Sequence, residues 1–199
     1  MKRAYCFDLD GTITSKEILP EIGKLMNKYE ELSLLTTKTL QGEVMFEESF
    51  RTRVDILKDL PISVVREIIS KIPVYPDVVN FISDHNKDCF IITGNLDVWV
   101  AELVDSWKCN LLSSKAHYRG DKLLGVDRII NKGIEVVKLH ESYDKVIAVG
   151  DGIADAEMLS NADVGIAFGA THSPVSSVIK SANYVVYEPD TLCTLLKTL

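Results

Sequence analysis

The sequence predicts an α/β protein in which a doubly wound parallel sheet carries a small helical cap inserted after its first strand. Short apolar runs alternate with amphipathic segments along most of the chain, a pattern typical of strands that alternate with helices. Residues 15–72 break this alternation and contain helical patterns only. Polar side chains stand where several apolar runs stop, and in a parallel sheet such positions meet at one edge, where ligands bind.

The expected strands are short, mostly apolar runs. They span residues 4–7, 89–92, 110–113, 146–149, 165–168 and 184–187. The helices expected between most of them span residues 77–85, 97–107, 132–140, 154–159 and 174–181. This alternation predicts helices on both faces of the sheet. A Gly-Asp pair within residues 118–126 predicts a β-hairpin, which is either a flap at the site or a surface hairpin.

The helix-only stretch predicts the domain organisation. Its helices are expected at residues 20–29, roughly 32–57, and 62–72. We expect residues 15–73 to form the cap, and residues 1–14 and 74–199 to form the catalytic core. The junctions near Thr14 and residues 73–76 are candidate hinges. The alternative is one plain domain with extra helices.

Composition and charge exclude several classes of protein. The 199 residues, 46% of them hydrophobic, suffice for one core with a small insert. The chain has no apolar run long enough for a membrane span, and Asp8 comes too early for a signal peptide, so we expect a cytoplasmic protein. A net charge of −7 argues against a nucleic-acid partner. We expect a small phosphorylated metabolite as the partner, no membrane partner, and a monomer or homodimer.

The four cysteines predict free thiols. None stands in a Cys-x-x-Cys pair, and Cys6 and Cys89 lie in apolar, strand-like runs. Buried thiols of this kind are typical of a reducing compartment.

The most informative residues are two carboxylates, Asp8 and Asp10, that follow the first apolar run. Residues two apart in an extended segment point to the same face, so these side chains would crowd each other unless a cation or a shared proton lay between them. Mg²⁺ is bound by one or two carboxylates together with substrate phosphate. The pair also offers a nucleophile beside a second carboxyl that can transfer a proton. The alternative is an acidic turn that closes a strand.

A second polar group follows the strand expected at residues 89–92. Thr93 can donate a hydrogen bond to a phosphate oxygen, and the amides of Gly94 and Asn95 can point at the same anion. The alternative is an ordinary turn from strand to helix, capped by Asn95 or Asp97.

Lys132 and two further carboxylates complete the candidate site. Lys132 follows Asn131, a good helix cap, and a cation at a helix start opposes the helix dipole unless an anion is bound there. The alternative is a solvated lysine. Asp151 stands in a glycine turn after a strand and could ligate the same metal. Asp155 could hold that metal directly, through water or through a second residue, or could serve only the helix dipole.

Together these residues resemble the phosphatases of the haloacid dehalogenase superfamily. The motifs that carry the resemblance are, in chain order, Asp8-Leu9-Asp10-Gly11-Thr12, Thr93, Lys132 and Gly150-Asp151-Gly152-Ile153-Ala154-Asp155. They span the whole chain and stand in the order of the family, and the combination is specific although each motif alone is not.

The resemblance implies a Rossmann-like core and an aspartyl-phosphate mechanism. It implies that Asp8 attacks phosphorus and that Asp10 protonates the leaving group and then activates water. It implies Mg²⁺ as the cofactor, held by Asp8, by the backbone carbonyl of Asp10 and by Asp151. Thr93 and Lys132, with the amide of Gly94, would bind the phosphate.

The insert resembles the cap of the phosphoserine phosphatases. The similar segment is Gln41-Gly42-Glu43-Val44-Met45-Phe46-Glu47-Glu48-Ser49-Phe50-Arg51-Thr52-Arg53-Val54-Asp55-Ile56-Leu57. The resemblance implies that Glu17 meets the substrate amine, that Arg53 meets its carboxylate, and that Phe46 covers the substrate. As alternatives, Glu17 could close a capping box with Thr14, and Arg53 could extend its head to solvent.

Two departures from that family leave the substrate open. The family has Ser-Gly-Gly where Thr93-Gly94-Asn95 stands here, and Asn where Ala154 stands. We therefore expect either phosphoserine or another small phosphorylated metabolite as substrate. Two rival classes are a receiver-type signalling module, which lacks a helical insert after its first strand, and a carbon-attacking dehalogenase, which needs no metal.

Overall fold

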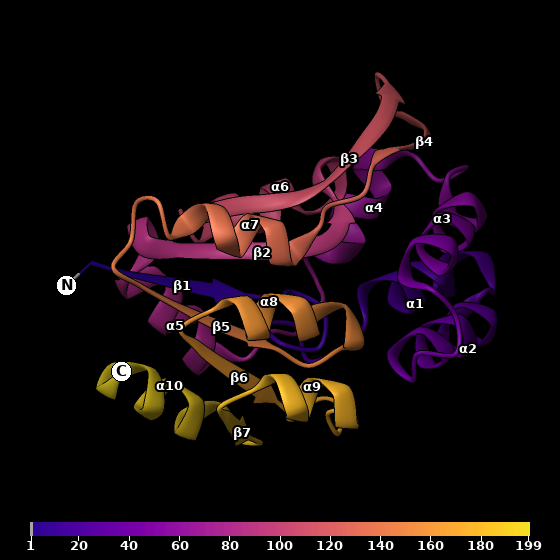
Figure 1. Cartoon of the computed structure of the whole chain (residues 1–199). Helices are drawn as coiled ribbons and strands as arrows, with labels where there is room; N and C mark the ends of the chain where they lie inside the picture. Colours follow the sequence, from indigo (N-terminus) through magenta and orange to yellow (C-terminus); the bar gives the residue numbers. More distant parts are fainter. Residues whose placement is uncertain (1) are drawn as a thin grey trace.

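The computed structural model describes residues 2–199 and contains a seven-stranded sheet with the order β4-β3-β2-β1-β5-β6-β7 (Figure 1). Its strands are β1 (Arg3–Phe7), β2 (Cys89–Leu96), β3 (Asn110–Arg119), β4 (Lys122–Arg128), β5 (Lys145–Gly150), β6 (Val164–Phe168) and β7 (Tyr184–Val186). All neighbours pair in parallel except β3 and β4, which form an antiparallel hairpin. The predicted fold class is confirmed.

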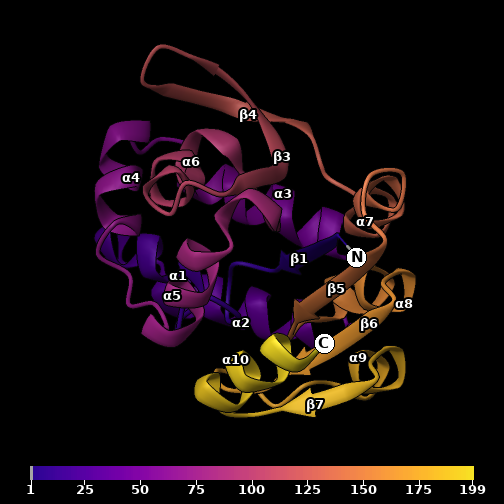
Figure 2. The ribbon, with the colours of Figure 1, turned by 90° about the vertical axis from the view of Figure 1, so that its left-hand side faces the viewer.

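Helices cover both faces of the sheet, as Figure 2 shows. One face carries α5 (Pro76–Asp84), α6 (Asp97–Ser106) and α10 (Pro189–Thr198). The other carries α7 (Lys132–Leu139), α8 (Ala156–Asn161) and α9 (Ser176–Ser181). Short 3-10 turns, η2 (Asn86–Asp88) and η3 (Ile153–Asp155), precede β2 and α8. The sequence did not predict α10, which begins at Pro189.

The first strand shows how the sheet separates two apolar layers. Tyr5 and Phe7 pack into the larger cluster, and Ala4 and Cys6 pack into the smaller one on the opposite face. Successive side chains of a strand point to opposite faces, and here both faces are covered, so the run is apolar throughout. At its end the chain leaves the apolar core, and Asp8 follows Phe7 directly.

The inserted helices lie beyond the carboxyl ends of the strands (Figure 1). They are α1 (Ile18–Gly23), η1 (Lys24–Met26), α2 (Tyr29–Leu40), α3 (Phe46–Leu57) and α4 (Ile62–Ile69). The two connections to the core pair with each other through a bridge between Thr14 and Val74, and the Ser15 amide donates to the Pro73 carbonyl at 2.9 Å. We keep the predicted division at these connections as a proposal, and call α1 to α4 the cap.

The prediction of one helix over residues 32–57 is wrong. α2 ends at Leu40 and α3 begins at Phe46. Between them Gly42 has φ +76°, a left-handed conformation that glycine adopts without strain. The first cap helix also ends sooner than predicted, because η1 follows Gly23 and Asn27 adopts a left-handed φ of 56°.

The predicted hairpin forms and holds the cap. Gly120 and Asp121 make its turn, and both carboxylate oxygens of Asp121 accept hydrogen bonds from Ser63, one from the amide and one from the hydroxyl, each at 2.7 Å. The first of these bonds satisfies the Ser63 amide in the first turn of α4, where amides have no partner within their own helix. The hairpin therefore supports α4.

Within residues 2–199, no helix has both the length and the apolar character that a membrane span needs. The four cysteines are free; three are buried and Cys109 is partly buried. Burial raises the pKa of the Cys109 and Cys193 thiols to about 11, and it also raises the pKa of the Cys6 and Cys89 thiols.

We expect all four thiols to react slowly with Ellman's reagent in the native protein at pH 8. The thiolate is the reactive form, and a thiol with a pKa near 11 is only about one thousandth ionised at that pH. After unfolding in guanidinium chloride, four equivalents should react within seconds. One thiol that reacts at the unfolded rate in the native protein would contradict the buried environment described above.

Candidate active site

The turn after β1 brings its carboxylates to the edge of the sheet. The Asp8 amide continues the ladder by donating to the Val149 carbonyl at 2.9 Å, so Asp8 stands beside the end of β5. Gly11 then turns the chain with φ +75°. A Cβ atom at Gly11 would lie 2.6 Å from Oδ2 of Asp151, so this position requires glycine for its conformation and for its space. Thr12 donates from its hydroxyl to Oδ1 of Asp151 at 2.8 Å.

Lys132 occupies the first turn of α7, as predicted, and Asn131 caps that helix by accepting the Ile134 amide at 2.9 Å. The Lys132 ammonium donates to Asp155 Oδ1 at 2.6 Å and also to Asp8 Oδ1. All three side chains are buried. Both carboxylates raise the pKa of Lys132 and outweigh the opposing effect of burial. Lys132 is therefore a buried, charged lysine and not a solvated one.

Three carboxylates form a cluster around this ammonium. Asp8, Asp151 and Asp155 each offer an oxygen, and these oxygens lie within 4.8 Å of one another. Burial, followed by the charge of Asp155, raises the pKa of Asp8 well above its usual value, and burial, followed by the charge of Asp8, does the same for Asp151. One ammonium does not balance three buried carboxylates.

The cluster fits a divalent cation. Within residues 2–199, the buried Oδ2 atom of Asp151 has no hydrogen-bond partner, although buried carboxylate oxygens are normally paired. Carboxylate oxygens are the ligands of hard divalent cations. Both carboxylate oxygens of Asp155 already have partners in the protein. Its Oδ1 pairs with Lys132, and its Oδ2 accepts the amides of Asp151 at 3.1 Å and Gly152 at 3.0 Å. It orients Lys132 and the turn that carries Asp151.

The Asp10 side chain lies apart from this cluster. Its Oδ1 accepts the Ile18 amide at 3.0 Å, and its Oδ2 accepts the Asn95 side-chain amide at 2.8 Å. Burial, followed by the charge of Glu17, raises the pKa of Asp10 to about 6. The predicted contribution of Asp10 to a metal through its backbone carbonyl stays a prediction. Asn95 lines the cavity described below and contacts Asp10, and its predicted role in binding substrate stays a prediction.

Thr93 and Gly94 both lie near the end of β2, but Gly94 lines the cavity described below and Thr93 does not. Thr93 is fully buried and accepts the Asn95 amide at 3.1 Å. Gly94 lies under the ring of Phe46, and a Cβ atom at Gly94 would lie 2.3 Å from that ring. Phe46 stacks on Phe50 with a centroid distance of 5.5 Å. The cap thus touches the core directly above the predicted phosphate-binding residues.

Arg53 is buried with 5% of its surface exposed, so its head does not extend to solvent. Its guanidinium donates to the Thr36 hydroxyl at 3.0 Å and to the Ser49 carbonyl at 3.3 Å. No carboxylate of residues 2–199 forms a salt bridge with it. Burial lowers its pKa, and the charges of Glu17 and Asp10 oppose that shift. A buried guanidinium without a carboxylate partner favours an anionic ligand.

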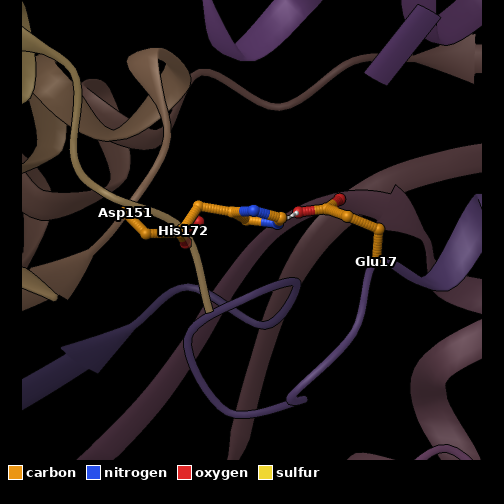
Figure 3. A group of neighbouring side chains, drawn as sticks. All are labelled: Glu17, Asp151 and His172. Carbon is orange, nitrogen blue, oxygen red and sulfur yellow. Dashed lines mark hydrogen bonds and ion pairs between the residues drawn. The ribbon is translucent and has the colours of Figure 1, made fainter. Parts of the chain in front are cut away.

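Glu17 contacts the core instead of capping a helix. It precedes α1 and makes no side-chain cap, so the capping-box alternative is not formed. Its Oε1 lies 3.0 Å from Nε2 of His172, as Figure 3 shows. His172 follows β6, and the sequence had given it no role.

A cavity of about 70 Å³ joins these residues. Of the predicted site residues, it is lined by Asp8, Asp10, Glu17, Phe46, Arg53, Gly94, Asn95, Lys132, Asp151 and Asp155. Thr36 lines it too, and with Ser49 it orients Arg53. Sequence analysis quoted Thr12 within the first motif without a role of its own, and it missed Thr36, because a threonine within a helix carries no signal that distinguishes it. The Ser49 contact is made by its backbone carbonyl, which no side-chain pattern predicts.

The comparisons with known proteins agree with this geometry. A family model described as haloacid dehalogenase-like hydrolase matches residues 6–160. The match covers most of the chain, so the chain belongs to the haloacid dehalogenase-like hydrolases.

Within this family the chain is similar to phosphoserine phosphatases, as predicted. It is 29% identical over 182 residues to that of Archaeoglobus fulgidus, with 85% of this chain and 53% of the relative covered. It is 27% identical to that of Methanocaldococcus jannaschii, over 85% of this chain and 86% of the relative. The chain thus spans about half the length of the first relative and most of the second.

A solved structure described as a phospho-aspartyl intermediate analogue of phosphoserine phosphatase superposes with a TM-score of 0.83. It is 26% identical in sequence, and the match covers 100% of this chain and 98% of that one. The likeness therefore includes the cap as well as the core.

We expect Gly11→Ala to lower both stability and activity. The left-handed φ alone costs about 1–2 kcal/mol for a residue with a Cβ atom, and the new atom would also displace Asp151. Gly120→Ala is the matched control, because Gly120 has φ +58° with no atom within 4 Å of an added Cβ. Urea unfolding and phosphatase assays compare the two. Equal losses of stability with full activity in both would contradict the proposed tight turn.

Proposed function

We propose that this protein is a Mg²⁺-dependent phosphatase that hydrolyses a small phosphate monoester through an aspartyl-phosphate on Asp8, with O-phosphoserine as the preferred candidate substrate. The observation that carries the proposal is the buried Lys132 ammonium held between Asp8 and Asp155, beside the unpartnered oxygen of Asp151. The names of the similar proteins support it. We also propose a cytoplasmic location, which suits the free thiols.

Asp8 is the proposed nucleophile. An oxygen of its carboxylate attacks phosphorus, the bond from phosphorus to the ester oxygen breaks, and the leaving alkoxide takes a proton. The Lys132 ammonium donates a hydrogen bond to Asp8, and in the proposed reaction it stabilises negative charge on Asp8 and on the phosphoryl oxygens. Gly94 lines the cavity, and its amide is the proposed further donor to the same oxygens.

Asp10 is the proposed acid and base. Its raised pKa of about 6 keeps part of it protonated near neutral pH, so it can donate a proton to the leaving alkoxide. Its ionised form then takes a proton from water, and the water oxygen attacks phosphorus and releases Asp8. Asn95 and the Ile18 amide hold both oxygens of this carboxyl, and so orient it for both steps.

Mg²⁺ is the proposed cofactor, held by Asp8, Asp151 and the Asp10 backbone carbonyl, with Asp155 in support. When bound, it neutralises charge on the phosphoryl oxygens. Its charge also suits a buried site in which one ammonium faces three carboxylates.

The cap is proposed to select the leaving group. Arg53 lacks a carboxylate partner and lines the cavity, so it is suited to a carboxylate on the substrate. Glu17 lines the same cavity and is suited to an ammonium. Arg53 and Glu17 together match the carboxylate and the ammonium of phosphoserine. Asn95 and Ala154, however, differ from the residues that the phosphoserine phosphatases have at these positions. A different small phosphorylated metabolite with a carboxylate is therefore the second candidate.

We expect Asp8→Asn to reduce kcat at least about a thousandfold, because the amide is not a nucleophile. Asp105→Asn, on the exposed side of α6, is the control and should keep full activity. EDTA should abolish wild-type turnover, and Mg²⁺ should restore it. Full activity of Asp8→Asn would exclude the covalent route, and phosphatase activity that persists in EDTA would contradict the proposed requirement for Mg²⁺.

We expect Arg53→Ala to lower kcat/KM for O-phosphoserine by roughly 10- to 100-fold, the range for losing a charged hydrogen bond. Turnover of p-nitrophenyl phosphate, which has no carboxylate, should fall far less. Arg51→Ala is the control, because Arg51 lies on the same helix, is exposed, and pairs with Glu47. Thermal unfolding checks that both variants fold. Equal losses on the two esters would contradict the role of Arg53.

A further inference from the structure

Glu17 and His172 join the cap to the core at the edge of the active-site cavity. Glu17 lies in the connection that enters the cap, and His172 lies in the loop between β6 and α9. Figure 3 shows the two side chains pointing at each other, with Nε2 of His172 3.0 Å from Oε1 of Glu17. These residues are 155 positions apart in the sequence, so only the fold brings them together.

His172 is the one side chain that restrains the Glu17 carboxylate. Among residues 2–199, no other group forms a hydrogen bond or salt bridge with that carboxylate. A glutamate side chain has several rotatable bonds, and holding it in one position costs conformational entropy. The hydrogen bond from His172 offsets this cost before a substrate enters.

The loop that carries His172 also contacts the other connection of the cap. The Thr171 hydroxyl lies 2.9 Å from the Tyr75 hydroxyl, and Tyr75 follows the bridge between Thr14 and Val74. The loop therefore bonds to both connections, and among the side-chain hydrogen bonds of residues 2–199 the one from His172 is the one that joins this loop to a residue of the proposed substrate site. This difference separates a role in positioning Glu17 from a role in holding the cap.

Glu17 lies between two cavities, so the position of its carboxylate decides which of them the charge faces. It lines the active-site cavity and also a second cavity of about 540 Å³, which His172 lines as well. In its present position its charge contributes to the raised pKa of Asp10 and of Asp151, and it opposes the lowering of the pKa of Arg53. His172 lines the second cavity and not the first, so its hydrogen bond fixes the Glu17 carboxylate at the boundary between the two cavities, with an oxygen of Asp151 within 4.8 Å.

We propose that His172 is a positioning residue, which fixes the Glu17 carboxylate at the edge of the active-site cavity and thereby sets the preference of the enzyme for a leaving group that carries an amine. The proposal rests on the proposed function, in which Glu17 meets an ammonium of the substrate. His172 itself acts through Glu17 and takes no part in the transfer of phosphorus.

The test compares two esters that differ at one group. O-phosphoserine carries an amine where 3-phosphoglycerate carries a hydroxyl, so the ratio of their kcat/KM values isolates the contribution of the amine. His172→Ala should reduce this ratio about tenfold, mainly through a higher KM for O-phosphoserine, which corresponds to losing one charge-assisted contact. His172→Gln places an amide donor near the position of Nε2 and should restore most of the ratio.

Tyr75→Phe is the matched control. It removes the hydrogen bond between the same loop and the other connection, while the ring keeps its packing against Phe168 at 5.8 Å. The ratio in this variant should equal that of the wild type. If Tyr75→Phe lowers the ratio as much as His172→Ala, the loop holds the cap in general, and the specific role of His172 is excluded.

The outcomes distinguish the positioning role of His172 from the proposed function of the enzyme. A wild-type preference for the amine that persists in His172→Ala overturns the positioning role and leaves the proposed function standing. A wild-type enzyme that turns over neither ester overturns the proposed function, and the positioning role falls with it. A preference that is lost in His172→Ala, kept in Tyr75→Phe and restored in His172→Gln supports both.

Discussion

A buried ammonium between two buried carboxylates determines the arrangement of this site. Lys132 begins α7, Asp8 follows β1 and Asp155 follows β5, so their contacts fix three elements relative to one another. Each of these charges would cost several kcal/mol if it were buried alone, and their mutual contacts offset that cost. The contacts still leave an excess of negative charge and an unpartnered oxygen on Asp151. Both features favour a divalent cation and a phosphate.

The cap adds a second constraint, which concerns the leaving group. Phe46 packs on Gly94 and Arg53 is buried, so the cap closes over the cavity with charged groups already inside it. A site with few waters strengthens electrostatic contacts, and it keeps an aspartyl-phosphate from side reactions. In the proposed function, selectivity depends on how firmly Arg53 and Glu17 are held. Thr36 and the Ser49 carbonyl hydrogen-bond Arg53, and His172 hydrogen-bonds Glu17.

Much of this could be predicted from local sequence. The apolar run before Asp8, the glycine turn around Asp151 and the cap of Asn131 before Lys132 each carry a signal in neighbouring residues. The alternation of strands and helices predicted a parallel sheet covered on both faces, whereas the order of the strands came from the structure. Contacts between distant residues carry no such signal. Asn95 contacts Asp10, 85 positions away, and His172 contacts Glu17, 155 positions away, and neither contact leaves a pattern in the neighbouring residues. The break at Gly42 was missed because helical patterns continue on both sides of it.

The central claim is that Asp8 takes up phosphorus in a site that Lys132 and the neighbouring carboxylates organise. Rapid acid quenching of the enzyme during turnover of O-phosphoserine with Mg²⁺, followed by peptide mass spectrometry, tests it most directly. Our account requires the phosphoryl group to be found on Asp8 and on no other residue. A phosphoryl group on another residue, or turnover with no phosphorylated protein at any quench time, would contradict it.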